Sequence, residues 1–144
     1  MDLTAACAAG EKSLQSAHFD VDGDKVADAV CWRVRKSAVY GDFVEVAAHI
    51  VGKGSKALDG YIALSAAPAG STDGSHGEPA LFGLDAISAA PDVLDKAAIG
   101  ELDTEGHFGR CIKITTGTGD KVWLFWVPDG KTERDRFYLQ TPYN

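Results

Sequence analysis

The sequence predicts a mostly β fold: a single domain over residues 1–144, built as an antiparallel β sandwich or a strongly bent sheet, with a short N-terminal helix or coil. After residue 25, apolar stretches of strand length alternate with glycine-rich turns. No stretch of convincing length repeats its apolar residues with the helical period. With 144 residues, 45% of them hydrophobic, the chain is long enough to bury one core of ordinary domain size.

Six stretches are predicted to be strands, in two antiparallel groups of three. The first group comprises residues 26–37, 42–51 and 57–66, and the second comprises residues 107–116, 121–128 and 134–140. Within each group the stretches are separated by short turns that contain glycine. Because antiparallel neighbours need only short connections, each group is expected to form a meander.

The side-chain pattern of two stretches predicts where the core lies. Residues 122–127 are apolar on both faces, so this strand is expected in the centre of a sheet, covered on each side. In the stretch 29–34, the two-residue period places Trp32 on one face and Cys31 on the other. Trp32, Trp123 and Trp126 are expected in the core, in preference to a carbohydrate-binding platform.

Three cysteines, at none of the spacings typical of zinc sites, favour a disulfide in an exported protein. Since Cys31 faces away from the main core, the N-terminal stretch can lie over it, with Leu3 and Leu14 as apolar cover. We therefore predict a disulfide between Cys7 and Cys31. A bond between Cys31 and Cys111 is the alternative.

Residues 20–28, Asp-Val-Asp-Gly-Asp-Lys-Val-Ala-Asp, are the most informative stretch for function. Asp20, Asp22 and Asp24 alternate along the chain, so a tight turn can point all three carboxylates inward. A hard cation with oxygen ligands would offset their mutual repulsion. Calcium is the predicted cofactor, and a solvated acidic turn is the alternative.

The pattern D-x-D-G-D-x-x-x-D, followed at once by an apolar strand, resembles the acidic loops of FG-GAP and VCBS repeats, and dockerin loops share its first half. The resemblance is local to residues 20–28. It implies that Asp28 and the backbone carbonyl of Val26 join Asp20, Asp22 and Asp24 as metal ligands.

Two positions depart from related loops. Lys25 stands at the sixth position, where these loops and EF-hands usually have glycine for a sharp turn. Cys31 stands at the twelfth, where an EF-hand has its bidentate glutamate, and this excludes an EF-hand. The chain has no internal repeat, and one acidic loop cannot build a propeller of FG-GAP blades.

Residues 68–79, between the two groups of strands, are small, polar and punctuated by proline. Long loops in compact domains are commonly functional or disordered. We predict that Ser71, Asp73, Ser75 and His76 contact a partner protein, and a passive connection is the alternative.

Catalytic patterns are missing from the sequence, so we predict no catalytic residues and no enzyme. The four histidines are scattered, without the spacing of metal ligands on one element. Ser75-His76 lacks the strand-turn-helix setting of a nucleophile. Asp85, Asp92 and Asp95 are expected to be solvated turn or helix-cap residues rather than a second metal site.

Charge and composition restrict the partners and the compartment. The net charge of −7 argues against nucleic acid and anionic membranes, and it is compatible with a basic protein partner. No apolar run is long enough to span a bilayer. Met1, the only methionine, is interpreted as a start placed ahead of a mature chain whose signal peptide was removed, which predicts a periplasmic or secreted protein; a natural start is the alternative.

These observations together predict a non-enzymatic, exported, protein-binding domain that a calcium loop stabilises. An inhibitor, or an immunity protein against a bacterial toxin or enzyme, is the favoured class. A calcium-stabilised adhesion or accessory domain is one alternative. A hydrolase whose catalytic residues come from distant positions is the other.

Overall fold

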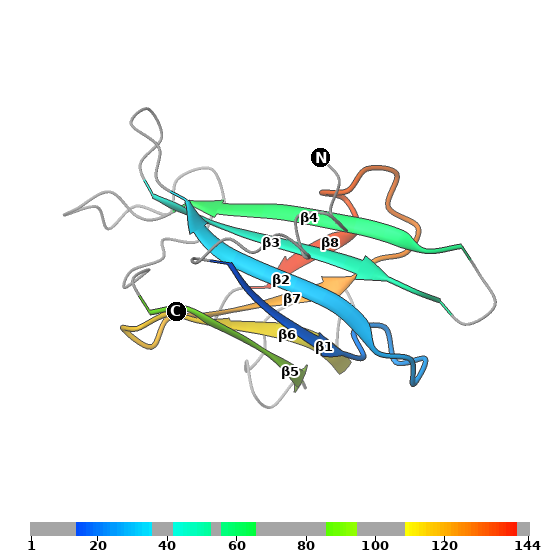
Figure 1. Cartoon of the computed structure of the whole chain (residues 1–144), viewed down its shortest axis with the longest axis horizontal. Helices are drawn as coiled ribbons and strands as arrows, with labels where there is room; N and C mark the ends of the chain where they lie inside the picture. The colour runs from blue at the N-terminus through cyan, green and yellow to red at the C-terminus, as the bar shows by residue number, and fades with distance from the viewer. Residues whose placement is uncertain (1–13, 36–41, 53–55, 66–85, 95–108, 141–144) are drawn as a thin grey trace.

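The computed structural model describes residues 14–35, 42–52, 56–65, 86–94 and 109–140. These residues form eight strands in two four-stranded antiparallel sheets, which lie one over the other (Figure 1). The first sheet has the order β1-β2-β3-β4: Gln15–Phe19, Asp28–Arg35, Phe43–Ile50 and Leu58–Ser65. The second has the order β5-β6-β7-β8: Ser88–Leu94, Gly109–Thr115, Lys121–Trp126 and Phe137–Gln140. The predicted mostly β fold is therefore confirmed, as two sandwiched meanders.

The register of the first sheet places alternate side chains on opposite faces, as the sequence predicts. On β2, Val30 and Trp32 are buried in the main hydrophobic cluster, and Val34 packs against it. Cys31 points to the other face, where it packs with Ala47, Leu14 and Tyr61. The main cluster draws side chains from both sheets, so one core joins them.

Strand β7 lies between β6 and β8 and is covered on both faces, which confirms the prediction for residues 122–127. Val122 and Leu124 enter the main core, while Trp123 and Phe125 pack on the other face with Leu94 and Cys111. Trp32 and Trp123 are buried, and Trp126 packs against the main core. The three tryptophans are therefore core residues.

The sandwich is closed on one side, where β4 meets β8. The backbone N–H of Tyr61 donates to the carbonyl of Glu133, and Arg136 donates to the carbonyl of Asp59 at 2.7 Å. Gly60 lies between them, and a methyl group built there would fall 2.6 Å from the Trp126 ring. Only glycine lets the edge of β4 come this close to the aromatic side chains of the second sheet.

Two strands were not predicted. Residues 15–19 form β1, and residues 88–94 form β5, although the sequence predicted no strand before residue 26 and none between residues 66 and 107. The predicted short N-terminal helix or coil falls on residues 1–13, outside the described ranges. Within those ranges no helix is long and apolar enough to cross a membrane.

Candidate metal centre

The acidic loop connects β1 to β2 and folds back on its own carboxylates. Asp20 accepts two backbone N–H groups: Oδ1 from Gly23 at 2.8 Å and Oδ2 from Lys25 at 2.9 Å. Gly23 and Lys25 have φ angles of +82° and +67°, and Lys25 is the one non-glycine residue with positive φ in the described ranges. This left-handed backbone allows a turn tight enough for Asp20 to reach both N–H groups.

The next two carboxylates fix the rest of the loop in the same way. Asp22 Oδ1 accepts from the N–H of Asp24 at 3.4 Å, and Asp24 Oδ1 accepts from the N–H of Val26 at 2.8 Å. Aspartate readily makes such local turns, because its side chain bonds the backbone two residues ahead. Asp20, Asp22 and Asp24 thus each stabilise part of the turn, and their carboxylates lie on the same side of the loop.

Asp28 closes the loop at the first residue of β2 and is fully buried. Its Oδ2 accepts from the N–H of Val21 at 3.0 Å, and its Oδ1 accepts from the N–H of Val51, just after β3, at 2.9 Å. Because a buried carboxylate is costly unless it is hydrogen-bonded or paired, these donors account for its position. The loop is thereby attached both to itself and to the end of β3.

The four carboxylates converge as predicted. Asp20, Asp22, Asp24 and Asp28 each offer one ligand oxygen, and these oxygens all lie within 4.8 Å of one another. Carboxylate oxygens are the donors that hard cations prefer, and the group can hold a metal ion. It is the only such cluster of histidine, cysteine and acidic groups within the described ranges.

Burial, hydrogen bonds and neighbouring charges shift the pKa values of three of these carboxylates. Burial raises the pKa of Asp22 to about 6, and Asp24 and Asp28 add to the effect. Burial also raises the pKa of Asp28, against the two N–H donors that lower it. For Asp20 burial acts in the same direction, but the N–H groups of Lys25 and Gly23 outweigh it and leave its pKa below the ordinary value. The crowded carboxylates therefore favour a bound cation, or a proton when no cation is present.

A residue that the sequence analysis did not single out also touches the loop. Arg110, the second residue of β6, donates from Nη1 to the backbone carbonyl of Asp20 at 3.4 Å. The same nitrogen lies 3.6 Å from Asp20 Oδ2. Arg110 and Asp20 are 90 residues apart, so no local pattern could have identified this contact.

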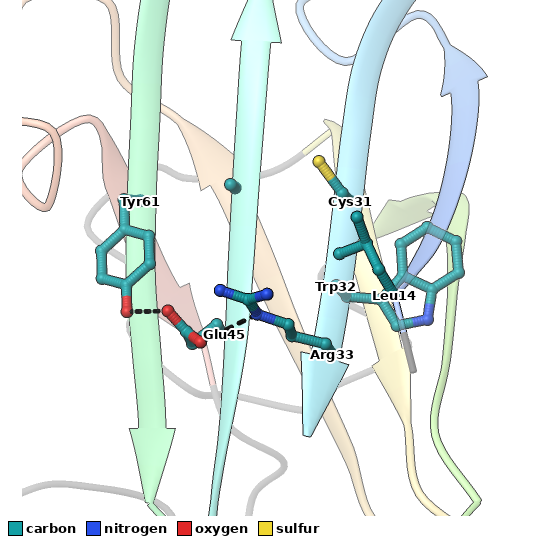
Figure 2. Close-up of a pocket in the computed structure, with 7 residues that line it drawn as sticks. Leu14, Cys31, Trp32, Arg33, Glu45 and Tyr61 are labelled. Atoms are coloured by element: carbon teal, nitrogen blue, oxygen red, sulfur yellow. Dashed lines mark hydrogen bonds and ion pairs between the residues drawn. The ribbon is translucent and has the colours of Figure 1, made fainter. Parts of the chain in front are cut away.

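A second group of polar side chains, which the sequence did not predict, lines a small pocket on the outer face of the first sheet. Figure 2 shows Tyr61, Glu45 and Arg33 in a row across β4, β3 and β2. Tyr61 donates to Glu45 at 2.5 Å, and Arg33 Nε donates to the same carboxylate at 3.1 Å. Burial, with the neighbouring Glu45, raises the pKa of Tyr61, so its hydroxyl stays protonated as the donor. The sequence contains one sign of this group, because Glu45 stands within the otherwise largely apolar stretch 43–50.

The other predicted site residues have different outcomes. Ser71, Asp73, Ser75 and His76 lie outside the described residues, and the partner-binding role stays a prediction. Asp92 is not a solvated turn or cap residue: it lies in β5, and its Oδ2 accepts the indole N–H of Trp123 at 3.0 Å. Asp85 and Asp95 lie outside the described ranges.

One observation distinguishes between the two predicted disulfides, Cys7–Cys31 and Cys31–Cys111. Cys111 is a buried free thiol on β6, so the alternative bond between Cys31 and Cys111 is wrong. Burial raises the pKa of Cys111 to about 12, which keeps its thiol protonated. The bond between Cys7 and Cys31 stays a prediction, because Cys7 lies outside the described residues.

Comparisons of this chain with protein-family models, with curated protein sequences and with solved structures found no match.

Proposed function

We propose that this chain is a calcium-stabilised, non-enzymatic β domain that is exported and acts by binding another protein. The observation that carries the proposal is the convergence of the Asp20, Asp22, Asp24 and Asp28 oxygens within 4.8 Å. Calcium takes six to eight oxygen ligands in flexible geometry, whereas magnesium requires near-ideal octahedral geometry and keeps several waters. A set of several protein oxygens therefore suits calcium better.

An extracellular location agrees with this chemistry. Extracellular calcium modules bind with dissociation constants of about 10⁻⁴ to 10⁻³ M, which millimolar calcium outside the cell is sufficient to fill. Bound calcium would offset the carboxylate repulsion that, together with burial, raises the pKa values of Asp22 and Asp28. The ion would then stabilise the hairpin of β1 and β2 without taking part in a reaction.

The proposed mode of action is inhibition of an enzyme or toxin, as an inhibitor or immunity protein. Its support is the acidic net charge of −7, suited to a basic partner, and the polar stretch 68–79. The non-enzymatic part of the proposal has separate support, because two described polar clusters make structural contacts: Glu45 with Arg33 and Tyr61, and His49 with Asp59.

The metal part of the proposal is tested by thermal unfolding of the metal-free protein with and without calcium. Calcium that binds only the folded state adds about 1.4 kcal/mol at ten times its dissociation constant, and the melting temperature should rise. Asp22→Ala should abolish the rise. Asp129→Ala, which removes an exposed aspartate from the turn after β7, should leave it intact. Coincident melting curves for the unmodified protein would contradict calcium binding.

The partner part is tested by replacing residues 71–76 with a glycine-serine linker of equal length. The partner is first captured with the unmodified protein. If this segment carries recognition, the linker variant should bind that partner at least tenfold more weakly, while its melting temperature changes little. The captured protein must also be an enzyme or toxin that loses activity in the complex. Capture of a glycan or a matrix protein instead would favour the adhesion domain, which the FG-GAP-like loop also suits.

A further inference from the structure

Arg110 places a fixed positive charge against the proposed calcium loop. Its Nη1 is 3.6 Å from Asp20 Oδ2 and 3.4 Å from the Asp20 carbonyl. A methyl group built on Gly23 would lie 3.7 Å from its Nε, so the guanidinium lies alongside the turn of the loop. Arg110 belongs to the second sheet, whereas the loop belongs to the first.

This position makes the guanidinium a competitor of a metal ion. The carboxylate that it approaches is one of the four that converge, and both cations would be attracted by the same negative charge. A divalent ion in the loop would lie within several ångströms of the guanidinium and repel it. Such repulsion between partly exposed charges changes a binding constant by about three- to tenfold, depending on ionic strength.

We propose that Arg110 is a tethered counter-cation that competes with calcium for Asp20 and thereby weakens calcium binding. The inference rests on the proposed calcium site. In the metal-free protein Arg110 partly neutralises the loop and links the two sheets. When calcium binds, the ion takes over this neutralisation, and the contact between Arg110 and Asp20 weakens. The affinity of the loop is thus determined in part by a residue outside it.

The test compares Arg110→Gln with Arg35→Gln by calorimetric titration of calcium into metal-free protein. Both changes remove one positive charge from a similarly exposed arginine, since the side chains are 46% and 48% exposed. Arg35 lies at the opposite end of β2 from Asp28, roughly 23 Å away by strand geometry, beyond the Debye length of about 8 Å. We expect Arg110→Gln to bind calcium about three- to tenfold more tightly and Arg35→Gln to bind as the unmodified protein does.

Thermal unfolding provides a second readout, because a purely structural role for Arg110 predicts a different pattern. Without metal, Arg110→Gln should melt at a lower temperature, since Asp20 has lost its counter-charge. In excess calcium this deficit should disappear or reverse, because the variant gains more from the ion. An arginine that only held the two sheets together would lower the melting temperature equally in both conditions.

Each result is decisive. Equal or weaker calcium binding by Arg110→Gln, with binding intact in the unmodified protein, overturns the inference and leaves the calcium site standing. If neither protein binds calcium, both the site and the inference are wrong. If only the variant binds, Arg110 excludes calcium from the unmodified protein, which supports the inference in its strongest form and contradicts calcium stabilisation of the native chain.

Discussion

Lys25 holds a left-handed backbone conformation in which glycine is the usual residue. Its φ is +67°, and its N–H donates to Asp20. Side chains with a β carbon lose about 1 kcal/mol in this conformation. Lys25→Gly should therefore raise the free energy of unfolding by about 0.5–1 kcal/mol, and calcium should bind more tightly because the turn forms more readily.

Urea unfolding and calcium titration check this result against Lys131→Gly. The control removes the same charge from another exposed turn, where φ is not positive, and should bring no gain in stability. Weaker calcium binding by Lys25→Gly would mean that the lysine ammonium is itself needed as a counter-charge.

Asp22 predicts opposite pH responses for the metal-free and calcium-bound protein. Its pKa is about 6 in the folded protein, against an ordinary value of 3.8, so the folded state binds more protons than the unfolded chain in this window. The stability of the metal-free protein should therefore fall as the pH rises from about 4 through about 6. The raised pKa of Asp28 acts in the same direction, and the lowered pKa of Asp20 acts only at more acidic pH.

Calcium requires the deprotonated carboxylates, so the added stability from calcium should shrink as the pH falls below about 6. Melting temperatures measured between about pH 7.5 and about pH 4.5 should converge for the two forms at the acidic end. A calcium effect that is constant over this range would show that Asp22 is not among the ligands.

Among the strands that the structure describes, β5 lies at the edge of its sheet, and its sequence opposes the addition of another strand. Pro91, opposite Ile112 in the pairing with β6, has no N–H to offer. The N–H of Val93, which points the same way two residues later, donates to Asp92 Oδ1 at 2.9 Å. Neither position therefore offers a free N–H to another strand. The side chain of Val93 is apolar and 66% exposed. Proline on an edge strand is a recognised protection against edge-to-edge association, which an exposed apolar side chain would otherwise favour.

Pro91→Val should restore the missing donor and promote self-association. Sedimentation velocity at increasing protein concentration should reveal dimers or larger species for this variant. Pro128→Val, in the exposed turn after β7, is the matched control and should stay as the unmodified protein. If Pro91→Val sediments as the unmodified protein does at every concentration, proline is not what keeps this edge apart.

The strands that the sequence predicted and those that it missed differ in composition. The six predicted strands carry apolar runs or clear alternation, for example Val44 and Val46 on β3. In contrast, β1 reads Gln-Ser-Ala-His-Phe, and β5 contains serine, proline and aspartate. Within the described part of the chain, both lie at the edges of their sheets, where fewer apolar side chains are needed and pairing with the neighbouring strand determines the structure.

In the candidate metal centre, too, the sequence predicted only part of the arrangement. Asp20, Asp22, Asp24 and Asp28 lie within nine residues, so their convergence could be predicted from spacing. The contact of Arg110 with the loop depends on how the two sheets pack, and the bond from Tyr61 to Glu45 depends on strand register. Neither follows from residues close together in the chain.

For the whole molecule, the disulfide is the prediction that bears on compartment. Peptide mapping without reduction should find Cys7 joined to Cys31 and Cys111 as a free thiol, in protein recovered from an oxidising compartment. Such a bond contributes about 2–4 kcal/mol in the chain-entropy account. Three alkylated thiols in that material would contradict both the bond and the proposed export.

The buried carboxylate of Asp28 connects the acidic loop to a distant amide. Its Oδ1 accepts from the N–H of Val51, 23 residues further along the chain. An ion on Asp28 would order this carboxylate, so the amide proton of Val51 should exchange with solvent more slowly when calcium is present. A single resonance beyond β3 would then report on occupancy of a loop that precedes β2, without any label in the loop itself.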